Sequence, residues 1–128
     1  MMFNSIKKAE DITYFLNEIN YLHDSYIIKV EYINDGISKI DHGLYFDPKQ
    51  TKLVLKILVT SIYDTVVEIE FDNLVEWQIK EHQWEITDTS VVFIEDNNIV
   101  WCDDIFESLE DLKKGSYVIA KSMKWRVV

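Results

Sequence analysis

The feature that most constrains this chain is a change of hydrophobic period at His23. Between Ser5 and Leu22, apolar residues recur at spacings of three and four and form a single stripe, which predicts a helix of about four turns. After His23, apolar residues mostly alternate with polar ones at every second position, which is the pattern of half-buried β-strands. An irregular N-terminal arm is the alternative to the helix.

The predicted strands are separated by short connections. Asn34-Asp35-Gly36 and Asn97-Asn98 are the expected hairpin turns, and a kink is expected at Asp72-Asn73. A short helix is expected within 106–114, closed by Gly115. The expected strands span 26–33, about 43–46, 53–60, 67–80, 84–95, 99–103 and 117–127. Because such short connections cannot form parallel crossovers, the sequence predicts an α+β fold: one N-terminal helix packed on a curved, mainly antiparallel sheet of about 6–8 strands, in a single domain over residues 1–128.

Cysteine usage and hydropathy indicate the compartment. Cys102 is the only cysteine, so neither an intramolecular disulfide nor a multi-cysteine zinc site can form. The N-terminal residues show no apolar region typical of a signal peptide. No apolar run approaches the ~20 residues of a membrane span. We therefore expect a cytoplasmic protein without a membrane partner.

The net charge of −10 comes mainly from one segment. Residues 64–111 hold fifteen acids and one base, Lys80, whereas residues 113–126 hold five bases and no acid. Strand alternation places several of these acids on the solvent side of one strand. They form either an ordinary solvated face, partly relieved by Lys56 or by the bases of the last strand, or an anionic surface that recognises a basic protein. The predicted contact residues are Glu68, Glu70, Asp72 and Glu76.

Nucleic acid is not an expected partner. The chain has no phosphate-binding loop and no glycine fingerprint, and its acidic balance repels phosphate. Lys121, Lys124 and Arg126 flank Trp125 on the last strand. Edge protection or internal ion pairing explains these few bases better than a nucleic-acid surface does.

His23-Asp24-Ser25 contains the residue types of a catalytic triad. Neighbouring side chains on a strand point to opposite faces, and no glycine elbow surrounds the serine, so a structural role at the helix-to-strand junction is favoured. The alternative is a ligand-binding or catalytic pocket that includes His42 and Asp103 with these three residues. The histidines lack the spacing of a zinc enzyme, so we expect no metal and no cofactor.

Cys102 is followed by two aspartates. Their negative charge would raise the pKa of the thiol and disfavour the thiolate that a nucleophile requires. We therefore interpret Cys102 as a buried structural residue.

Three short motifs suggest a family resemblance. They are Leu22-His23-Asp24-Ser25-Tyr26-Ile27, Trp101-Cys102-Asp103, and the closing run from Ala120 to Arg126. Together they resemble a group of small, uncharacterised bacterial α+β proteins with an "HDS" strand start and a "WCD" strand end, some of which are suspected immunity components of toxin systems. The resemblance implies a cytoplasmic, non-enzymatic protein and assigns no catalytic residue.

These observations predict a non-catalytic, immunity-like protein-interaction module whose acidic sheet face meets a basic partner. A small enzyme or ligand-binding domain is the second hypothesis. A homo-oligomer is the third, because aromatic-rich edge strands readily extend a sheet across a two-fold axis.

Overall fold

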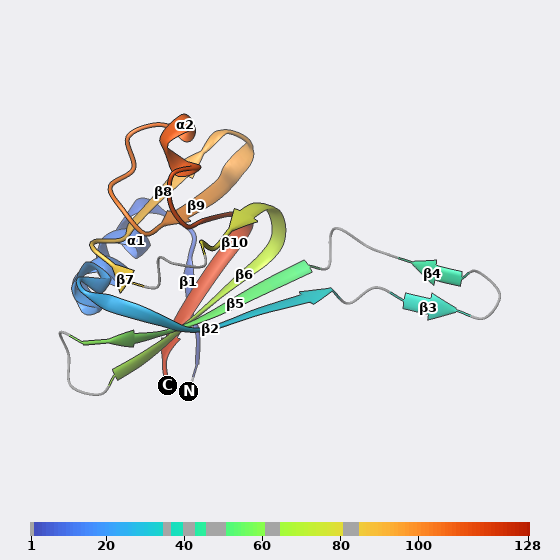
Figure 1. Ribbon diagram of the computed structural model, residues 1–128, viewed down its shortest axis with the longest axis horizontal. Coiled ribbons are helices and arrows are strands. Elements are labelled where there is room, and N and C mark those ends of the chain that lie inside the picture. Colours follow the sequence, from blue (N-terminus) through green and yellow to red (C-terminus); the bar gives the residue numbers. More distant parts are fainter. Residues whose placement is uncertain (1, 35–36, 40–42, 46–50, 61–64, 81–84) are drawn as a thin grey trace.

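The protein folds as one main helix against a strongly curled antiparallel sheet (Figure 1). The computed structural model describes residues 2–34, 37–39, 43–45, 51–60, 65–80 and 85–128. The path through the main sheet is β7-β2-β5-β6-β10-β9-β8, and β1 pairs with part of β10. Its strands are β1 (Asn4–Ile6), β2 (Ser25–Asn34), β5 (Thr51–Val59), β6 (Thr65–Gln78), β7 (Glu85–Ile86), β8 (Ser90–Ile94), β9 (Asn98–Cys102) and β10 (Tyr117–Val127).

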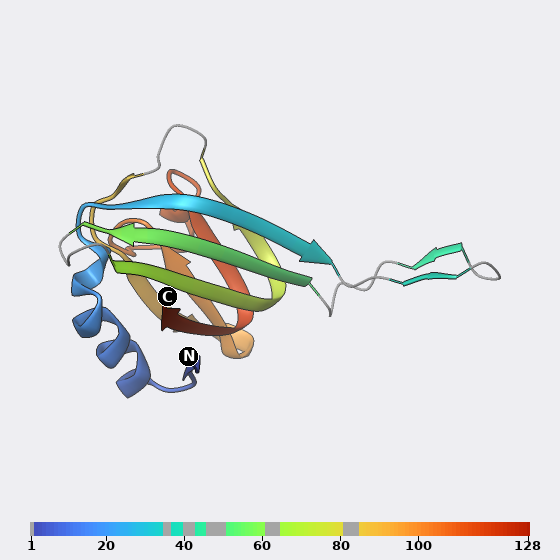
Figure 2. The same ribbon diagram turned by 90° about the horizontal axis from the view of Figure 1, so that it is seen from below.

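All of these strand pairs are antiparallel, and the sheet curls into a half-barrel (Figure 2). The helix α1 (Ala9–Glu18) lies beside the curled sheet. Phe15 of α1 is fully buried, and its ring lies 5.1 Å from that of Trp125 on β10. The inward-facing residues of β5 and β6, among them Leu55 and Ile69, complete the core. The predicted α+β fold is therefore confirmed.

β6 and β10 are the two longest strands and pair along most of their length. The predicted kink in β6 is present, because Asn73 has a φ of 57°. The register with β10 shifts by one residue between Ile119 and Ala120, opposite this kink. A β-bulge of this kind bends the strand and helps the sheet to curl.

β3 (Ile37–Lys39) and β4 (Gly43–Tyr45) form a separate two-stranded sheet, drawn apart from the main sheet in Figure 1. The strand predicted near residues 43–46 corresponds to β4. The turn predicted at Asn34-Asp35-Gly36 falls partly outside the described residues.

The helix is shorter than the predicted span of Ser5 to Leu22. At its start, the Asp11 carboxylate accepts hydrogen bonds from the backbone N–H groups of Lys7 and Lys8. Ile6 belongs to the strand β1, where it pairs with Met123 of β10. At its end, residues Asn20–Leu22 form the short turn η1, where all three have positive φ. Ile6 and Leu22 are both buried, so the apolar stripe predicted burial correctly but not the helical conformation of its ends.

The strand predicted over 84–95 is also wrong in its extent. Residues 85–94 form two strands at opposite edges of the sheet, because β7 pairs with β2 whereas β8 pairs with β9. Between them, Thr89 donates its N–H to the Tyr21 carbonyl at 2.8 Å and its hydroxyl to the Cys102 carbonyl at 2.6 Å. These long-range bonds interrupt a pattern that looks continuous in the sequence.

The following turn lies one residue earlier than predicted. Asp96 and Asn97 have positive φ values of 63° and 59°, whereas Asn98 is already paired with Ile94 in β9. These values match the central residues of a hairpin turn, which Asp and Asn tolerate well. The predicted short helix is present as α2 (Leu109–Leu112), capped by the Ser108 hydroxyl.

Candidate functional site

The acids of β6 lie on the outer face of the sheet among bases from both neighbouring strands. Arg126 of β10 contacts the Glu68 carboxylate at 2.7 Å through both Nε and a terminal nitrogen. The Glu70 carboxylate lies 3.2 Å from the Lys52 ammonium and 3.4 Å from that of Lys124. We call this set the ion-pair ladder: Lys52, Glu68, Glu70, Asp72, Lys124 and Arg126.

The ion-pair ladder contains three acids and three bases, so its formal charges cancel. The side chains of Glu68 and Glu70 are only 13% exposed. Burial raises the pKa of Asp72, and the charge of Glu70 adds to that effect. These three acids therefore serve first to hold the sheet together, while Glu76 lies exposed beyond the kink. That these four acids contact a partner stays a prediction.

His23 joins the helix-to-strand junction to the segment between β7 and β8. Its Nδ1 lies 2.9 Å from the Thr87 carbonyl oxygen and 3.1 Å from the Asp88 carboxylate. Because a carbonyl can only accept, Nδ1 carries the proton. Nε2 lies 3.2 Å from the Asp24 carboxylate. The Thr87 carbonyl, followed by Asp24 and Asp88, raises the pKa of His23.

Asp24 and Ser25 are placed by the backbone of the same junction. Asp24 has a φ of 56°, and its carbonyl accepts the Thr60 hydroxyl at 2.7 Å. Ser25 is fully buried opposite Ile86, and its hydroxyl has no hydrogen-bond partner in the described part of the chain. The three residues therefore do not form a nucleophile–base pair with each other.

The "HDS" and "WCD" motifs meet through residues 86–89. Ser25 pairs with Ile86, His23 binds Thr87, and the Thr89 hydroxyl binds the carbonyl of Cys102. Nothing in the sequence spacing indicates this meeting, because it depends on the chain crossing from one sheet edge to the other between β7 and β8.

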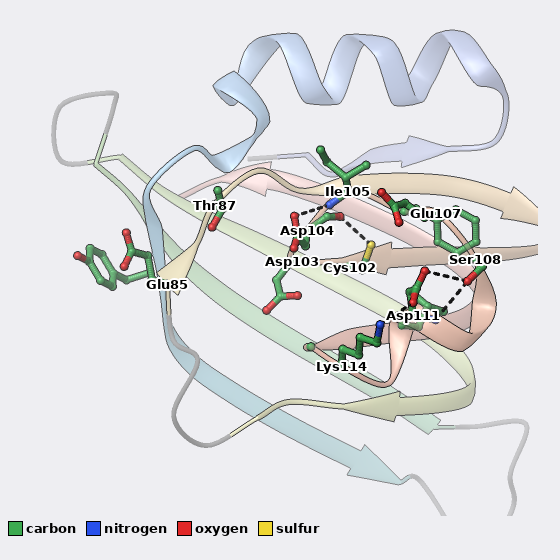
Figure 3. A pocket seen from close by; sticks show the side chains of 14 residues that line it. Glu85, Thr87, Cys102, Asp103, Asp104, Ile105, Glu107, Ser108, Asp111 and Lys114 are labelled. Carbon is green, nitrogen blue, oxygen red and sulfur yellow. Dashed lines mark hydrogen bonds and ion pairs between the residues drawn. The ribbon is translucent and has the colours of Figure 1, made fainter.

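A cavity of about 720 Å³ opens beside this crossing (Figure 3). Tyr26 and residues from β7, the end of β9, the following loop and α2 line it. Of the described residues that line it, five are acids and one is a base. We call it the anionic cavity, and its charged lining residues are Glu85, Asp103, Asp104, Glu107, Asp111 and Lys114.

Asp103 is the most enclosed of these acids. Its exposed fraction is 9%, and its Oδ1 accepts the Ser116 N–H at 3.2 Å. Gly115 makes room for it, since a Cβ at that position would lie 2.6 Å from Oδ1. Burial raises the pKa of the Asp103 carboxyl, and the Ser116 N–H partly opposes this. The fold therefore holds a carboxylate at a position where its charge is poorly solvated.

The other acids of the anionic cavity differ in whether they form ion pairs within the protein. The Asp111 carboxylate lies 3.0 Å from the Lys114 ammonium and accepts the Ser108 hydroxyl, and these hydrogen bonds lower its pKa. Glu85, Asp104 and Glu107 form no ion pair with any residue that the structure describes. Within the described part of the chain, these three carboxylates of the cavity therefore keep negative charge that no ion pair neutralises.

Cys102 lines the same cavity. Burial raises the pKa of its thiol, and the group donates to the Asp104 carbonyl at 3.1 Å. At neutral pH the group is therefore the neutral thiol and a poor nucleophile.

Of the five residues predicted for the alternative pocket, Asp103 lines the anionic cavity. His23 reaches it indirectly, through the carbonyl of the lining residue Thr87. Asp24 and Ser25 do not line it, and His42 lies outside the described residues. Among the described residues, no group of three or more His, Cys, Asp or Glu side chains is arranged to hold a metal ion.

Comparison with protein families, with curated proteins and with solved structures finds no match. The resemblance carried by the "HDS" and "WCD" motifs therefore stays an expectation. Within the described part of the chain, no helix is long and apolar enough to cross a membrane.

Proposed function

We propose that the protein is a non-catalytic interaction module that binds a basic protein, and that the anionic cavity receives a cationic side chain of that partner. The observation that carries this proposal is the contrast in charge between the two acidic regions. The acids of the ion-pair ladder meet bases of the same chain, whereas residues 85–111 contain nine acids and no base.

The chemistry of the cavity suits an arginine or lysine side chain. A volume of about 720 Å³ lies within the range of about 300–1,000 Å³ that is usual for binding pockets. An entering cation would stabilise the charged form of Asp103, which burial alone disfavours. The surrounding carboxylates would speed the approach of a basic partner and select against an acidic one.

The predicted contact residues Glu68, Glu70, Asp72 and Glu76 remain a second possible contact area for the same partner. Glu76 fits this role best, because it is exposed and lies outside the ion-pair ladder. An immunity-like role in the cytoplasm is what the motif resemblance implies, and it is compatible with a basic toxic partner.

The test uses a fluorescent arginine-rich peptide and measures its binding by anisotropy over a salt series. We expect Asp103→Asn to weaken binding about tenfold or more and to reduce the salt dependence. The asparagine side chain can still accept the Ser116 N–H, so the variant should remain folded. Equal binding by the wild type and Asp103→Asn would contradict the proposal.

A small ligand-binding domain is the second candidate, favoured because Asp103 lines the anionic cavity and Thr87 connects it to His23. The ligand class would then be a small organic cation such as a polyamine. Saturable binding of spermidine in the cavity, lost in Asp103→Asn and accompanied by no binding of the peptide, would favour this candidate over the interaction module.

A further inference from the structure

β2 forms an open edge of the main sheet. Among the described residues, β2 pairs on the side away from β5 with β7 alone, through Ser25 and Tyr26. No described strand pairs with residues 27–34 on that side, and Figure 2 shows β2 as the outermost long strand. The opposite edge, β8, is better covered, since only Phe93 of its five residues is exposed.

The open edge carries exposed apolar side chains, and one of its rings, that of Tyr32, stacks on Trp77 of β6 at 5.9 Å. Residues 28–32 are all exposed, and Ile28 and Tyr32 are 54% and 44% exposed. Most strand edges carry devices that prevent pairing with another chain. Here a register shift between Ile27 and Lys29 and the charge of Lys29 are such devices. Of the next four residues, 30–33, all except Glu31 are apolar or aromatic.

The charge pattern across the outer face is incomplete at this edge. In the row that crosses the sheet there, Lys56 lies opposite Glu68, and Glu68 lies opposite Arg126. Lys29 breaks this alternation, because it lies opposite Lys56. The acid that it contacts is Glu31 on its own strand, at 3.5 Å. An acid placed on the open side of Lys29 would give this lysine an opposite charge directly across the strands, which Lys56 on its other side does not.

We propose that a second copy of this chain supplies that acid, by antiparallel pairing of β2 with β2 across a two-fold axis at Val30. Residues directly opposite in antiparallel strands share a face of the sheet, so the axis must pass through a residue position. An axis at Lys29 would oppose two lysines, and an axis at Glu31 would oppose two glutamates. Only the axis at Val30 opposes Lys29 of each copy with Glu31 of the other.

The same register also pairs the apolar residues. Ile28 of each copy lies opposite Tyr32 of the other, and the two Val30 side chains meet at the axis. Each Lys29 then has two acidic neighbours on the same face: Glu31 of its own strand and Glu31 of the other copy. Main-chain hydrogen bonds would join the two sheets. This inference goes beyond the proposed function and does not depend on the anionic cavity.

The test measures self-association by sedimentation velocity across a range of protein concentrations. The wild type should be a concentration-dependent dimer. Lys29→Glu and Glu31→Lys should each weaken dimerisation about tenfold or more, because each opposes like charges at both symmetry-related positions. Mixing the two variants should restore a dimer, since each supplies the charge that the other lacks. The double exchange Lys29→Glu/Glu31→Lys should dimerise like the wild type.

Matched controls carry the same changes of net charge at exposed positions away from β2. Lys121→Glu and Glu10→Lys should both keep the dimer affinity of the wild type. A wild type that stays monomeric at about 0.5 mM would overturn the proposal. It would also be overturned by single variants that keep the wild-type affinity, or by single variants that remain monomeric after mixing.

Discussion

The ion-pair ladder and the anionic cavity draw on the same acid-rich segment but use its charge in opposite ways. In the ladder, β5 and β10 flank β6 and bring lysine and arginine into register with its glutamates. Around the cavity, β9, the loop after it and α2 bring acids together, and Lys114 is the one base among the described lining residues. The two groups occupy successive parts of that segment, 68–72 and 85–111, but the sequence does not show which of them meets bases of the same chain.

The difference shows that the charge of a segment says little about a surface until the neighbouring strands are known. A glutamate flanked by two bases stabilises the sheet, and it is largely withdrawn from solvent. A glutamate without such neighbours keeps its field available for a partner. The acids that the sequence singled out by their alternation belong mainly to the first group.

The largest expected effect on stability comes from reversing a charge inside the ion-pair ladder. Glu70→Lys would place a third cation between Lys52 and Lys124, which now lie 3.2 and 3.4 Å from its carboxylate. We expect a loss of about 2–3 kcal/mol in the free energy of unfolding by urea. The matched change at the cavity, Glu107→Lys, should cost less than about 0.5 kcal/mol. Equal losses would remove the distinction between the two regions.

An intermediate effect is expected where the cavity wall is most tightly built. Gly115→Ala places a methyl group 2.6 Å from Oδ1 of Asp103, so the carboxylate must shift and part of its bond to Ser116 is lost. The expected loss is about 1–2 kcal/mol. In an Asp103→Ala background the same change should cost less than about 0.5 kcal/mol, because the contacted atoms are gone. Additive losses in this double-mutant cycle would contradict the contact.

The smallest effect is a pH dependence at the junction beside the cavity. The pKa of His23 is raised above its usual value of 6.5, first by the Thr87 carbonyl and then by Asp24 and Asp88. Protonated His23 therefore stabilises the folded state below about pH 6.5, and this contribution disappears as the pH rises through the folded-state pKa. The stability gap between the wild type and His23→Ala should be wider at about pH 5.5 than at about pH 8.5.

Urea denaturation at both pH values measures that gap. Asp88→Asn serves as the control. In this background, the stability gap caused by His23→Ala should differ less between about pH 5.5 and about pH 8.5, because one of the carboxylates that favour the imidazolium is gone. A gap that does not change with pH would show that His23 acts only through its neutral hydrogen bond to Thr87.

Local patterns predicted the helix, most of the strands and the antiparallel sheet, because each depends on residues close together in the chain. The same patterns failed where a distant contact decides the conformation. The left-handed turn at Asn20–Leu22 is joined to the break at Thr87–Thr89 by the hydrogen bond from the Thr89 N–H to the Tyr21 carbonyl. Of the acids that line the cavity, the sequence singled out Asp103 alone as a pocket residue. Glu85 and Asp111 lie far apart in the chain, and the passage from β7 to β8 brings their segments to one cavity.

The most direct test of the central claim compares two triple variants that each remove three negative charges. One neutralises the cavity, with Glu85→Gln, Asp104→Asn and Glu107→Gln, and the other neutralises the ladder, with Glu68→Gln, Glu70→Gln and Asp72→Asn. Binding of the arginine-rich peptide is measured for both under conditions where circular dichroism shows that they are folded. We predict that the cavity variant loses about tenfold or more in affinity while the ladder variant stays within about twofold of the wild type. A greater loss in the ladder variant would contradict the claim and return the binding surface to the sheet face.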